Sequence, residues 1–390
     1  MAITFPASPT NGQTFTSGNK TWQWDGTTWL AYGASLSPTV LKVDAANARV
    51  GVNNQSPAYA LDVNGTIEGT QFLQGTDYLS PYQGFRNAVM NGDMRIAQRG
   101  TSFSPIAGGT WSLDRWNTGF KDSGITLNIT QQASTNASDP QIFNEFQYYI
   151  QLSNTAFTAG NTYYFGQKIE DVRKFAGTTV TLSYWAKVSS GTHTVSRLFL
   201  NQQFGTGGSS EVDNIGAASP TYTTTWTKFT QTISVPSISA KTVGTGSHLY
   251  LLWQIVPTSN ISIQITGVQV ERGSVATPFE QRPIQQELAL CQRYFYTSSD
   301  LRIVGGVYST SVTYAPFRLP VPMRVTPSVT GNTTSNTYYL NPSGTFLLIS
   351  AVIVQAGLTT DSAVLILTTG QPSYSAVSIQ ATGIQVSAEL

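Results

Sequence analysis

The sequence predicts an all-β protein built from several modules in series. Only 11% of its 390 residues are charged, and Thr, Ser, Asn, Gln and Gly fill much of the chain. Short segments of alternating apolar and polar residues recur, and 34 glycines and 18 prolines separate them. Alternation is typical of half-buried strands, and Gly, Pro, Asn and Ser are typical of turns. A single segment, 283–297, has convincing helical spacing.

Composition excludes several classes of function. The net charge is +1 and the longest cationic run is the pair Arg173–Lys174, so we expect no nucleic-acid partner. The single cysteine, Cys291, and two histidines are too few for a disulfide or a zinc cluster, and we expect no metal and no cofactor. We find neither a secretory signal nor an apolar run of membrane length, so we expect synthesis in a cytoplasm and no membrane insertion.

The first predicted module, residues 1–33, is small and aromatic. Asp25-Gly26 lies between Trp22 and Trp24 on one side and Trp29 on the other. Asp-Gly between alternating segments predicts a hairpin, because glycine accepts positive φ. The three tryptophans would share one face, most simply as the core of a tiny domain.

The second predicted module, residues 34–83, resembles a shaft segment more than a domain. Two short alternating strands, Val50–Val52 and Tyr59–Val63, flank a polar break. Such strands bury too little apolar surface to be stable alone, and their edges need cover. Identical copies of the chain are the simplest cover, so we predict a homotrimer. The predicted interface residues here are Val50, Val52, Leu61, Val63 and Ile67.

The third module, residues 84–282, is predicted to be a sandwich or jelly roll. Many short strands are separated by Gly-, Ser- and Thr-rich turns, such as 205–208. The segments 261–265 and 268–270 alternate cleanly between apolar and polar residues. This pattern is typical of strands with one face in a core and one in solvent.

The predicted helix, residues 283–297, begins at a proline, which suits a first helical turn. Its apolar residues recur at steps of four, three and four, at Ile284, Leu288, Cys291 and Phe295. This spacing indicates either a threefold coiled-coil seam between chains or a stripe packed on the chain's own jelly roll. In the seam, Cys291 would be a small buried hydrophobe.

The last module, residues 298–390, is predicted to be a β tip that is nearly uncharged. Tyr338 and Tyr339 are adjacent in it, so an extended backbone would turn only one of them outward.

We find no catalytic motif and predict no enzyme activity. Asp93 follows Asn-Gly and reads as a turn residue, and Asp114 beside Arg115 reads as an ion pair or a turn anchor. Sugar binding needs only exposed aromatic faces and neutral hydrogen-bonding groups. The candidate carbohydrate-binding residues are Trp111, Trp116, Tyr338 and Tyr339.

An ordered series of motifs runs through 87–295: NAVMNGDMRIAQRGTSF, TWSLDRWNTGF, VTLSYWAKV, GVQVERGSVATPFEQRP and ELALCQRYF. The series resembles a family of bacteriophage tail-fibre proteins, marine or cyanophage-like, whose central domain is a jelly roll like those of carbohydrate-binding modules. Residues 49–67 are similar to shaft segments of trimeric tail fibres. Residues 317–330, FRLPVPMRVTPSVT, are similar to a segment of their distal tips.

The resemblance implies an elongated homotrimeric fibre in the virion. Residues 1–33 would attach to tail, baseplate or adaptor proteins, and the jelly roll and distal tip would bind host surface polysaccharide. Two alternatives remain open. One is a depolymerase that trims glycans, and the other is a purely structural virion connector.

Overall fold

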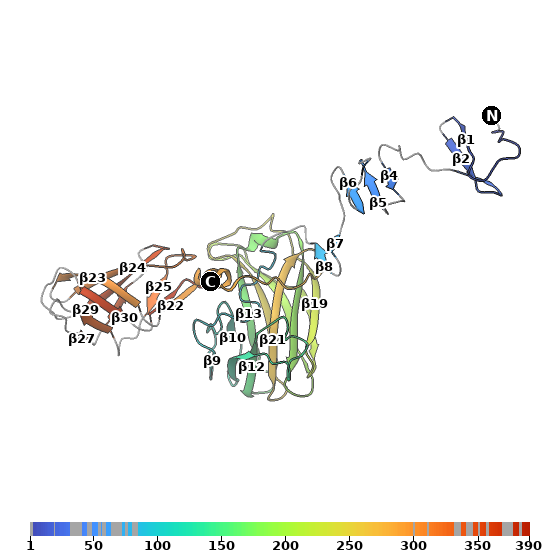
Figure 1. Ribbon diagram of the computed structural model, residues 1–390. Helices are drawn as coiled ribbons and strands as arrows, with labels where there is room; N and C mark the ends of the chain where they lie inside the picture. The colour runs from blue at the N-terminus through green and yellow to red at the C-terminus, as the bar shows by residue number, and fades with distance from the viewer. Residues whose placement is uncertain are drawn as a thin grey trace. The chain divides into compact units, whose positions relative to one another are not determined.

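The computed structural model describes residues 3–18, 20–31, 41–44, 49–53, 56, 60–63, 72–74, 77–79, 85–298, 301–309, 312–330, 337–340, 346–349, 352–355, 359–368, 377–381 and 384–390. The chain divides into two compact units, Met1–Leu79 and Ser80–Leu390. Strands dominate both units, as Figure 1 shows, and the prediction of an all-β protein is confirmed.

The first unit begins with a three-stranded antiparallel sheet of β1 (Thr14–Ser17), β2 (Lys20–Trp24) and β3 (Trp29–Ala31). The Asp25 carboxylate accepts hydrogen bonds from the backbone of Thr28 and Thr27, which hold its pKa at about 2 and fix the turn. Phe5 stacks on Trp29 and meets Trp22 edge-on, both at 5.3 Å, and Trp24 lies 5.7 Å from Trp29. The predicted hairpin and its aromatic cluster are therefore present.

Short strands form most of the other described residues of this unit. They are β4 (Leu41–Asp44), β5 (Arg49–Val52), β6 (Leu61–Val63), β7 (Phe72–Gln74) and β8 (Asp77–Leu79). β5 pairs antiparallel with β4 and parallel with β6, and β7 pairs with β8. Leu61 is 58% exposed, while Val50, Val52 and Val63 are half-buried. Ile67 lies outside the described residues. These exposures leave the predicted interface residues free for a neighbouring chain, and the trimer stays a prediction.

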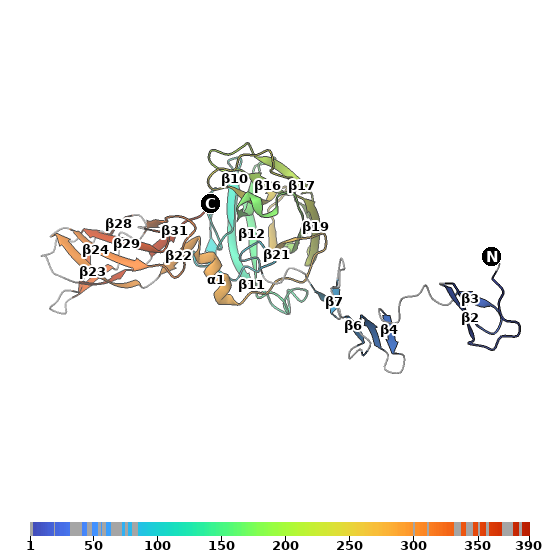
Figure 2. The same ribbon diagram turned by 90° about the horizontal axis from the view of Figure 1, so that it is seen from above.

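The second unit contains the predicted sandwich, whose two antiparallel layers are visible in Figure 2. One sheet has the order β10-β13-β20-β16-β17 and the other β19-β14-β21-β12-β11-β9. The first sheet contains β10 (Asn117–Phe120), β13 (Tyr163–Glu170), β16 (Arg197–Gln203), β17 (Val212–Ala218) and β20 (His248–Ile255). The second contains β9 (Ser102–Phe103), β11 (Thr126–Ala133), β12 (Tyr148–Ala156), β14 (Thr179–Val188), β19 (Thr227–Ser234) and β21 (Ser262–Arg272).

Smaller elements complete the sandwich. The strands β15 (His193–Thr194) and β18 (Thr221–Tyr222) pair with each other, and a short 3-10 helix, η1 (Val172–Phe175), follows β13.

The core lies between the two sheets and contains buried tryptophan. Trp116 is fully buried, stacks on Phe165 at 4.9 Å and lies 6.2 Å from Trp253. Its indole N–H donates to the Asn91 carbonyl at 3.0 Å. The prediction that Trp116 contacts a sugar is therefore wrong, because its apolar ring and its donor are both satisfied inside the protein.

The outer face of the six-stranded sheet is partly covered by the loop 134–147. Ile142 and Phe146 of this loop pack with Tyr149 and Trp226 in a second, smaller core. The Asp139 carboxylate fastens the loop, because it accepts hydrogen bonds from Lys187 Nζ and Trp226 Nε1, both at 2.8 Å.

The helix α1 (Ile284–Gln292) packs on the chain's own jelly roll. Cys291 is fully buried and Phe295 is 3% exposed, whereas Ile284 is 42% exposed and Leu288 is half-buried. Burial raises the pKa of the Cys291 thiol well above its usual value. Cys291 and Phe295 therefore do not belong to an interchain seam. Their contacts are made inside one chain, which was the alternative reading, and only Ile284 and Leu288 remain available to another copy.

Two further sheets follow the helix. One contains β22 (Phe295–Ser298), β25 (Ser328–Thr330) and β31 (Ile384–Ser387). The other contains β23 (Leu301–Ser309), β24 (Val312–Arg318), β26 (Thr337–Leu340), β27 (Phe346–Ile349), β28 (Val352–Gln355), β29 (Ser362–Thr368) and β30 (Val377–Ala381).

After β31, Glu389 and Leu390 return to the jelly roll, although the sequence suggested a tip that spans the whole of 298–390. Glu389 pairs with Arg115, and also with Arg99 at 2.9 Å. Lys168 Nζ donates to the Leu390 carbonyl at 2.7 Å.

The burial of Trp116 generates a prediction about stability. Trp116→Ala should lower the free energy of unfolding of the jelly roll by about 3–5 kcal/mol, since it opens a cavity and leaves the Asn91 carbonyl without its donor. Urea unfolding followed by fluorescence measures this loss. Trp111→Ala is the matched control, because Trp111 is only half-buried, and an equal loss in both variants would contradict the assignment.

Candidate functional site

Three of the five motifs, the first and the last two, meet in one largely buried cluster, which we call the motif junction: Asn87, Asn91, Glu280, Arg282 and Glu287. Asn91 has a positive φ of 53° and its side-chain amide donates to the carbonyls of Ile96 (2.8 Å) and Asp114 (3.0 Å). Its backbone N–H donates to Glu287. The junction thereby ties α1 to the first loop of the jelly roll.

Ion pairs complete the motif junction. Arg282 contacts Glu280 at 2.9 Å and Glu287 at 3.1 Å. Glu280 also accepts from the backbone N–H groups of Arg86 (2.9 Å) and Asn87 (3.0 Å). These residues satisfy one another inside the protein, so the motifs build the scaffold and are not themselves a binding surface.

The two motif carboxylates also act as structural anchors. Asp114 accepts from the backbone and side chain of Gln98 at 2.7 and 2.6 Å, which confirms the turn-anchor reading. Asp114 does not pair with Arg115, which pairs with Glu389 instead. Asp93 pairs with Arg95.

A surface of different character lies on the outer side of the five-stranded sheet. Alternate residues of β13, β20 and β16 point away from the core and form what we call the polar–aromatic face: Tyr164, Lys168, Arg197, Asn201, Tyr250 and Gln254. Between its two polar rows lie Leu252 and Phe199, which are 7% and 2% exposed and give the face an apolar middle row. Tyr164, Gln254 and Arg197 share one row of the register, and Lys168, Tyr250 and Asn201 share another. The face therefore offers tyrosines among amide and cationic groups.

A strand glycine lies beside each of the two tyrosines of this face. A Cβ added at Gly119 would lie 3.9 Å from the Tyr164 ring, and one added at Gly166 would lie 3.0 Å from the Tyr250 ring. The Tyr250 ring therefore leans over Gly166 of the neighbouring strand, as aromatic residues do beside glycines in sheets, whereas Tyr164 makes an ordinary cross-strand contact with Gly119. The Tyr250 hydroxyl also donates to Asn117 Oδ1 at 2.8 Å. A ring held in this way turns its second face away from the sheet.

The polar side chains of the face are held in place by one another. Arg197 Nε donates to Gln254 Oε1 at 2.7 Å. The Asn201 amide donates to Glu211 (3.1 Å) and to Asp213 (3.2 Å). Such pre-ordered groups lose little conformational entropy when a ligand binds.

The predicted binding residues are distributed unevenly. Trp111 bridges to Asn117 at the margin of this face and is half-buried, with the Arg115 guanidinium 5.3 Å from its ring, so it remains a candidate. Tyr338 and Tyr339 of β26 pair with Leu348 and Leu347 of β27. The side chains of the two tyrosines are not among those that the structure describes. Sequence reasoning missed Tyr164 and Tyr250. The signal that could have found them is a tyrosine at an outward position of a strand beside a strand glycine.

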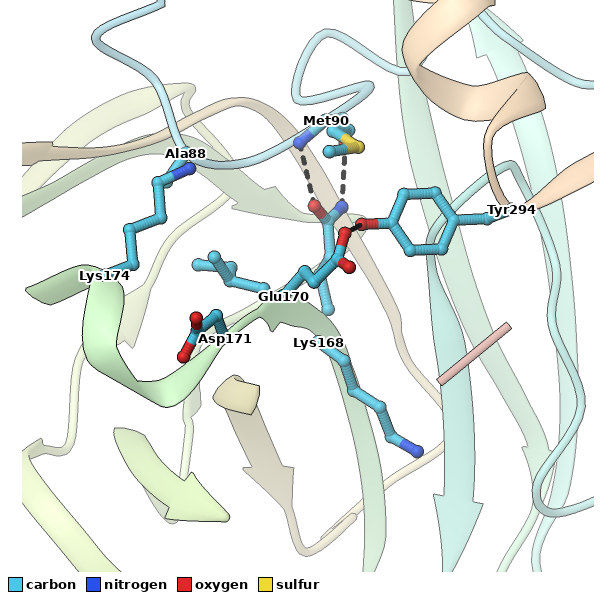
Figure 3. A pocket seen from close by; sticks show the side chains of 9 residues that line it. Ala88, Met90, Lys168, Glu170, Asp171, Lys174 and Tyr294 are labelled. Atoms are coloured by element: carbon cyan, nitrogen blue, oxygen red, sulfur yellow. Dashed lines mark hydrogen bonds between the residues drawn. The ribbon is translucent and has the colours of Figure 1, made fainter. Parts of the chain in front are cut away.

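A pocket of about 320 Å³ lies at the end of β13 (Figure 3). Its lining consists of Ala88, Met90, Gln167, Lys168, Ile169, Glu170, Asp171, Lys174 and Tyr294. Glu170 accepts hydrogen bonds from the Tyr294 hydroxyl (2.7 Å) and from Arg293 (2.9 Å). Burial opposes the ionisation of Glu170, but these hydrogen bonds outweigh it and lower its pKa.

A second pocket, of about 510 Å³, lies beside the loop 134–147. It is lined by Asp93, Arg95, Phe143, Asn144, Glu145, Phe146, Gln147 and Gln281. Burial raises the pKa of both Asp93 and Glu145, and Phe143 is 42% exposed. Two carboxyl groups that favour protonation beside an exposed ring are the one arrangement in the described residues that we connect with glycan cleavage.

Two searches for other site types find nothing in the described part of the chain. His, Cys, Asp and Glu do not gather there in threes as a metal site would require. The described helices include none that is long and apolar enough to cross a membrane.

Comparisons with known proteins were made against families, curated proteins and solved structures. No family model and no curated protein matches the chain. The chain is similar to a putative sugar binding protein from Bacteroides thetaiotaomicron VPI-5482, at 12% identity and a TM-score of 0.32, over 48% of this chain and 100% of that chain.

Two other solved structures are similar over nearly the same share of this chain. One is the enzymatically active domain of bacteriophage CBA120 tailspike protein 4 (18% identity, TM-score 0.32), with 48% of this chain and 22% of that chain covered. The other is a family 11 carbohydrate-binding module from Clostridium thermocellum (8% identity, TM-score 0.29), with 46% of this chain and 98% of that chain covered. TM-scores this low assign no function to the chain. The two packed antiparallel sheets place it among β-sandwich proteins.

A histidine at the edge of the polar–aromatic face generates a prediction about pH. Burial lowers the pKa of His248 from 6.5 to about 4; its hydrogen bond to the Gly246 carbonyl opposes this, and Lys168 adds to it. Between pH 6.5 and about 4, His248 is protonated in the unfolded chain but neutral in the folded chain. The contribution of neutral His248 to stability is therefore complete above pH 6.5 and is lost as pH falls toward 4. His248→Gln should therefore reduce the loss of stability between pH 7 and pH 5 by about 1–2 kcal/mol.

Urea unfolding at the two pH values measures this difference. The control is the interval from pH 7 to pH 9, where His248 is neutral in both states and the variant should follow the wild type. Identical acid dependence of the two proteins would contradict the prediction.

Proposed function

We propose that the protein is a bacteriophage tail fibre that binds host-cell surface polysaccharide, with the polar–aromatic face as its main glycan-binding surface. The observation that carries the proposal is the Tyr250 ring, held against Gly166 with Tyr164 on the same face of the sheet, among fixed amide and guanidinium groups. Flat aromatic faces pack against the apolar faces of pyranose rings, while amides and guanidinium groups select hydroxyls.

The resemblance to tail fibres supports the wider setting of this proposal. Three of the motifs that resemble that family supply the residues of the motif junction, which fixes the exit of the chain through α1. In this proposal residues 1–33 attach to tail, baseplate or adaptor proteins, and residues 34–83 form the trimeric shaft. The protein would then reside in the virion, and the tip would be a second receptor-binding region.

A trimeric fibre would carry three identical copies of the polar–aromatic face. Each site would bind weakly, and linkage would raise the avidity through effective concentration. This arrangement requires no large apolar cleft, in agreement with a sheet face that is mostly polar.

The tyrosine pair gives a direct test. Tyr164→Ala and Tyr250→Ala should each weaken binding to purified host polysaccharide about five- to tenfold, because each removes one stacking platform. Glycan-array binding and competition of adsorption to host cells measure the effect. The matched control is Phe143→Ala, which removes an exposed ring outside the face. Loss of binding in the control but not in the tyrosine variants would contradict the site.

The proposed shaft gives a second test. The purified chain should have a native mass of three times 42.1 kDa in sedimentation equilibrium. Val52→Asp should shift the mass toward the monomer, because it places a charge in the proposed interchain strand contact. Val325→Asp, at a valine that is 39% exposed elsewhere, should leave the mass unchanged. A monomeric wild-type chain would sink the shaft proposal.

Asp93 and Glu145 favour one alternative function, a depolymerase, since they line one pocket. Release of new reducing ends from host polysaccharide, abolished by Glu145→Gln, would replace binding by cleavage as the function. The third possibility, a connector without a ligand, is separated by removing 301–381 while keeping 384–390, which the jelly roll needs as a partner for Arg115. A fibre that assembles and fails to adsorb would speak against the connector.

A further inference from the structure

We propose that the pocket at the end of β13 binds the anionic substituent of an acidic sugar, so that the glycan recognised by this protein is charged. The inference rests on the proposed function and adds the ligand class to it. The pocket volume, about 320 Å³, lies at the lower end of small-molecule sites, which span roughly 300–1,000 Å³. It suits one sugar unit.

The charges that line the pocket do not cancel locally. Glu170 is bound by Arg293, and Asp171 pairs with Arg173 at 3.3 Å. Each carboxylate therefore has a cation of its own outside the pocket lining. The two lysines of the lining, Lys168 and Lys174, feel the charges of Glu389, Glu170 and Glu280 but form no ion pair among the described residues; Figure 3 shows both side chains.

Lys174 has no anionic partner among the described residues. Its ammonium makes no hydrogen bond or ion pair there and lies 5.9 Å from the centre of the Phe175 ring. Burial by the surrounding protein is the main cause of its lowered pKa; Arg282 and Arg272 lower the pKa further, whereas Glu170 and Glu280 raise it. The Lys174 side chain is exposed and lines the pocket, where a bound anion would form the ion pair that it lacks among the described residues.

Lys168 connects this pocket with the polar–aromatic face. Its ammonium donates one hydrogen bond to the Leu390 carbonyl and lies 5.7 Å from the centre of the Tyr250 ring. An ammonium group has three donors, so further donors remain. A sugar stacked on Tyr250 would thus be followed along β13 by a position where a charged group meets Lys168 and then Lys174.

The other groups of the pocket do not compete for an anion. Gln167 exchanges two hydrogen bonds of 2.8 Å with the backbone of Met90, and the Tyr294 hydroxyl is committed to Glu170, as the dashed lines of Figure 3 show. The lysines are consequently the groups with spare hydrogen-bonding capacity. A neutral sugar would leave the Lys174 charge without a partner, whereas a carboxylate or a phosphate ester would supply one.

The experiment is an array that carries uronate-containing oligosaccharides beside their carboxyl-reduced forms, and phosphorylated sugars beside their dephosphorylated forms. The full-length protein should bind members of one anionic set at least tenfold more tightly than their neutral partners. Preference for the uronate set would identify a carboxylate as the bound group, and preference for the phosphorylated set would identify a phosphate. Lys174→Gln should reduce the ratio of anionic to neutral binding about tenfold, because it deletes one charge-assisted hydrogen bond.

Two further variants keep the result specific. Lys174→Arg should retain the preference, since it keeps the positive charge. Lys121→Gln removes an exposed lysine just after β10, at the opposite end of β13 from the pocket, and should bind like the wild type. Thermal unfolding of each variant checks that the fold is intact.

The outcomes separate this inference from the proposed function. Equal binding to anionic and neutral partners, or a preference that survives in Lys174→Gln, overturns the acidic-sugar pocket while glycan binding stands. Binding to no sugar at all overturns both. An anionic preference that disappears in Lys174→Gln and persists in Lys174→Arg and Lys121→Gln supports the pocket.

Discussion

The buried contact between Asn91 and Glu287 is the constraint on which the rest of the second unit depends. Asn91 sits at a positive φ and its groups are shared between α1, the loop before β10 and the core tryptophan Trp116. Arg282 balances the buried charge of Glu287. Breaking such a pair would leave a buried charge without compensation, so the start of the domain, its end and the helix are held as one piece.

The two sheets of the sandwich present different outer faces, and this difference positions the candidate site. One outer face is partly covered by the loop 134–147, which brings its own aromatic core and is fastened through Asp139. The other carries half-buried tyrosines, amides and cations along β13, β16 and β20. Covering one face and leaving polar groups on the other gives a rigid scaffold with a single side suited to an extended polar ligand.

The sequence predicted the strands of the sandwich well but not the burial of every outer face. The alternation in 261–265 and 268–270 became the central strand β21, and the turn-rich spacing became a two-layer sandwich. The predicted solvent face of β21 is wrong, because its polar residues Gln264 and Gln269 are 8% and 0% exposed. Several predictions about the positions of single side chains are wrong. Trp116 lies in the core, Asp114 anchors Gln98 instead of pairing with Arg115, and Cys291 and Phe295 are buried within one chain. A tryptophan in a turn-rich motif and a heptad-like stripe each fit a core and a surface equally well, so pattern alone does not choose between them.

The sequence by itself determined the all-β class, the single helix, the aromatic hairpin at the start and the absence of common catalytic motifs, because these follow from local periodicity and composition. Only the tertiary structure decided that the Tyr250 ring leans over Gly166, which carboxylates are already paired, and that Lys174 forms no ion pair among the described residues. Those features depend on residues such as Gly166 and Tyr250, which are far apart in the chain and meet through strand register. Register is fixed by the buried face of the sheet and not by the outward residues that form the site.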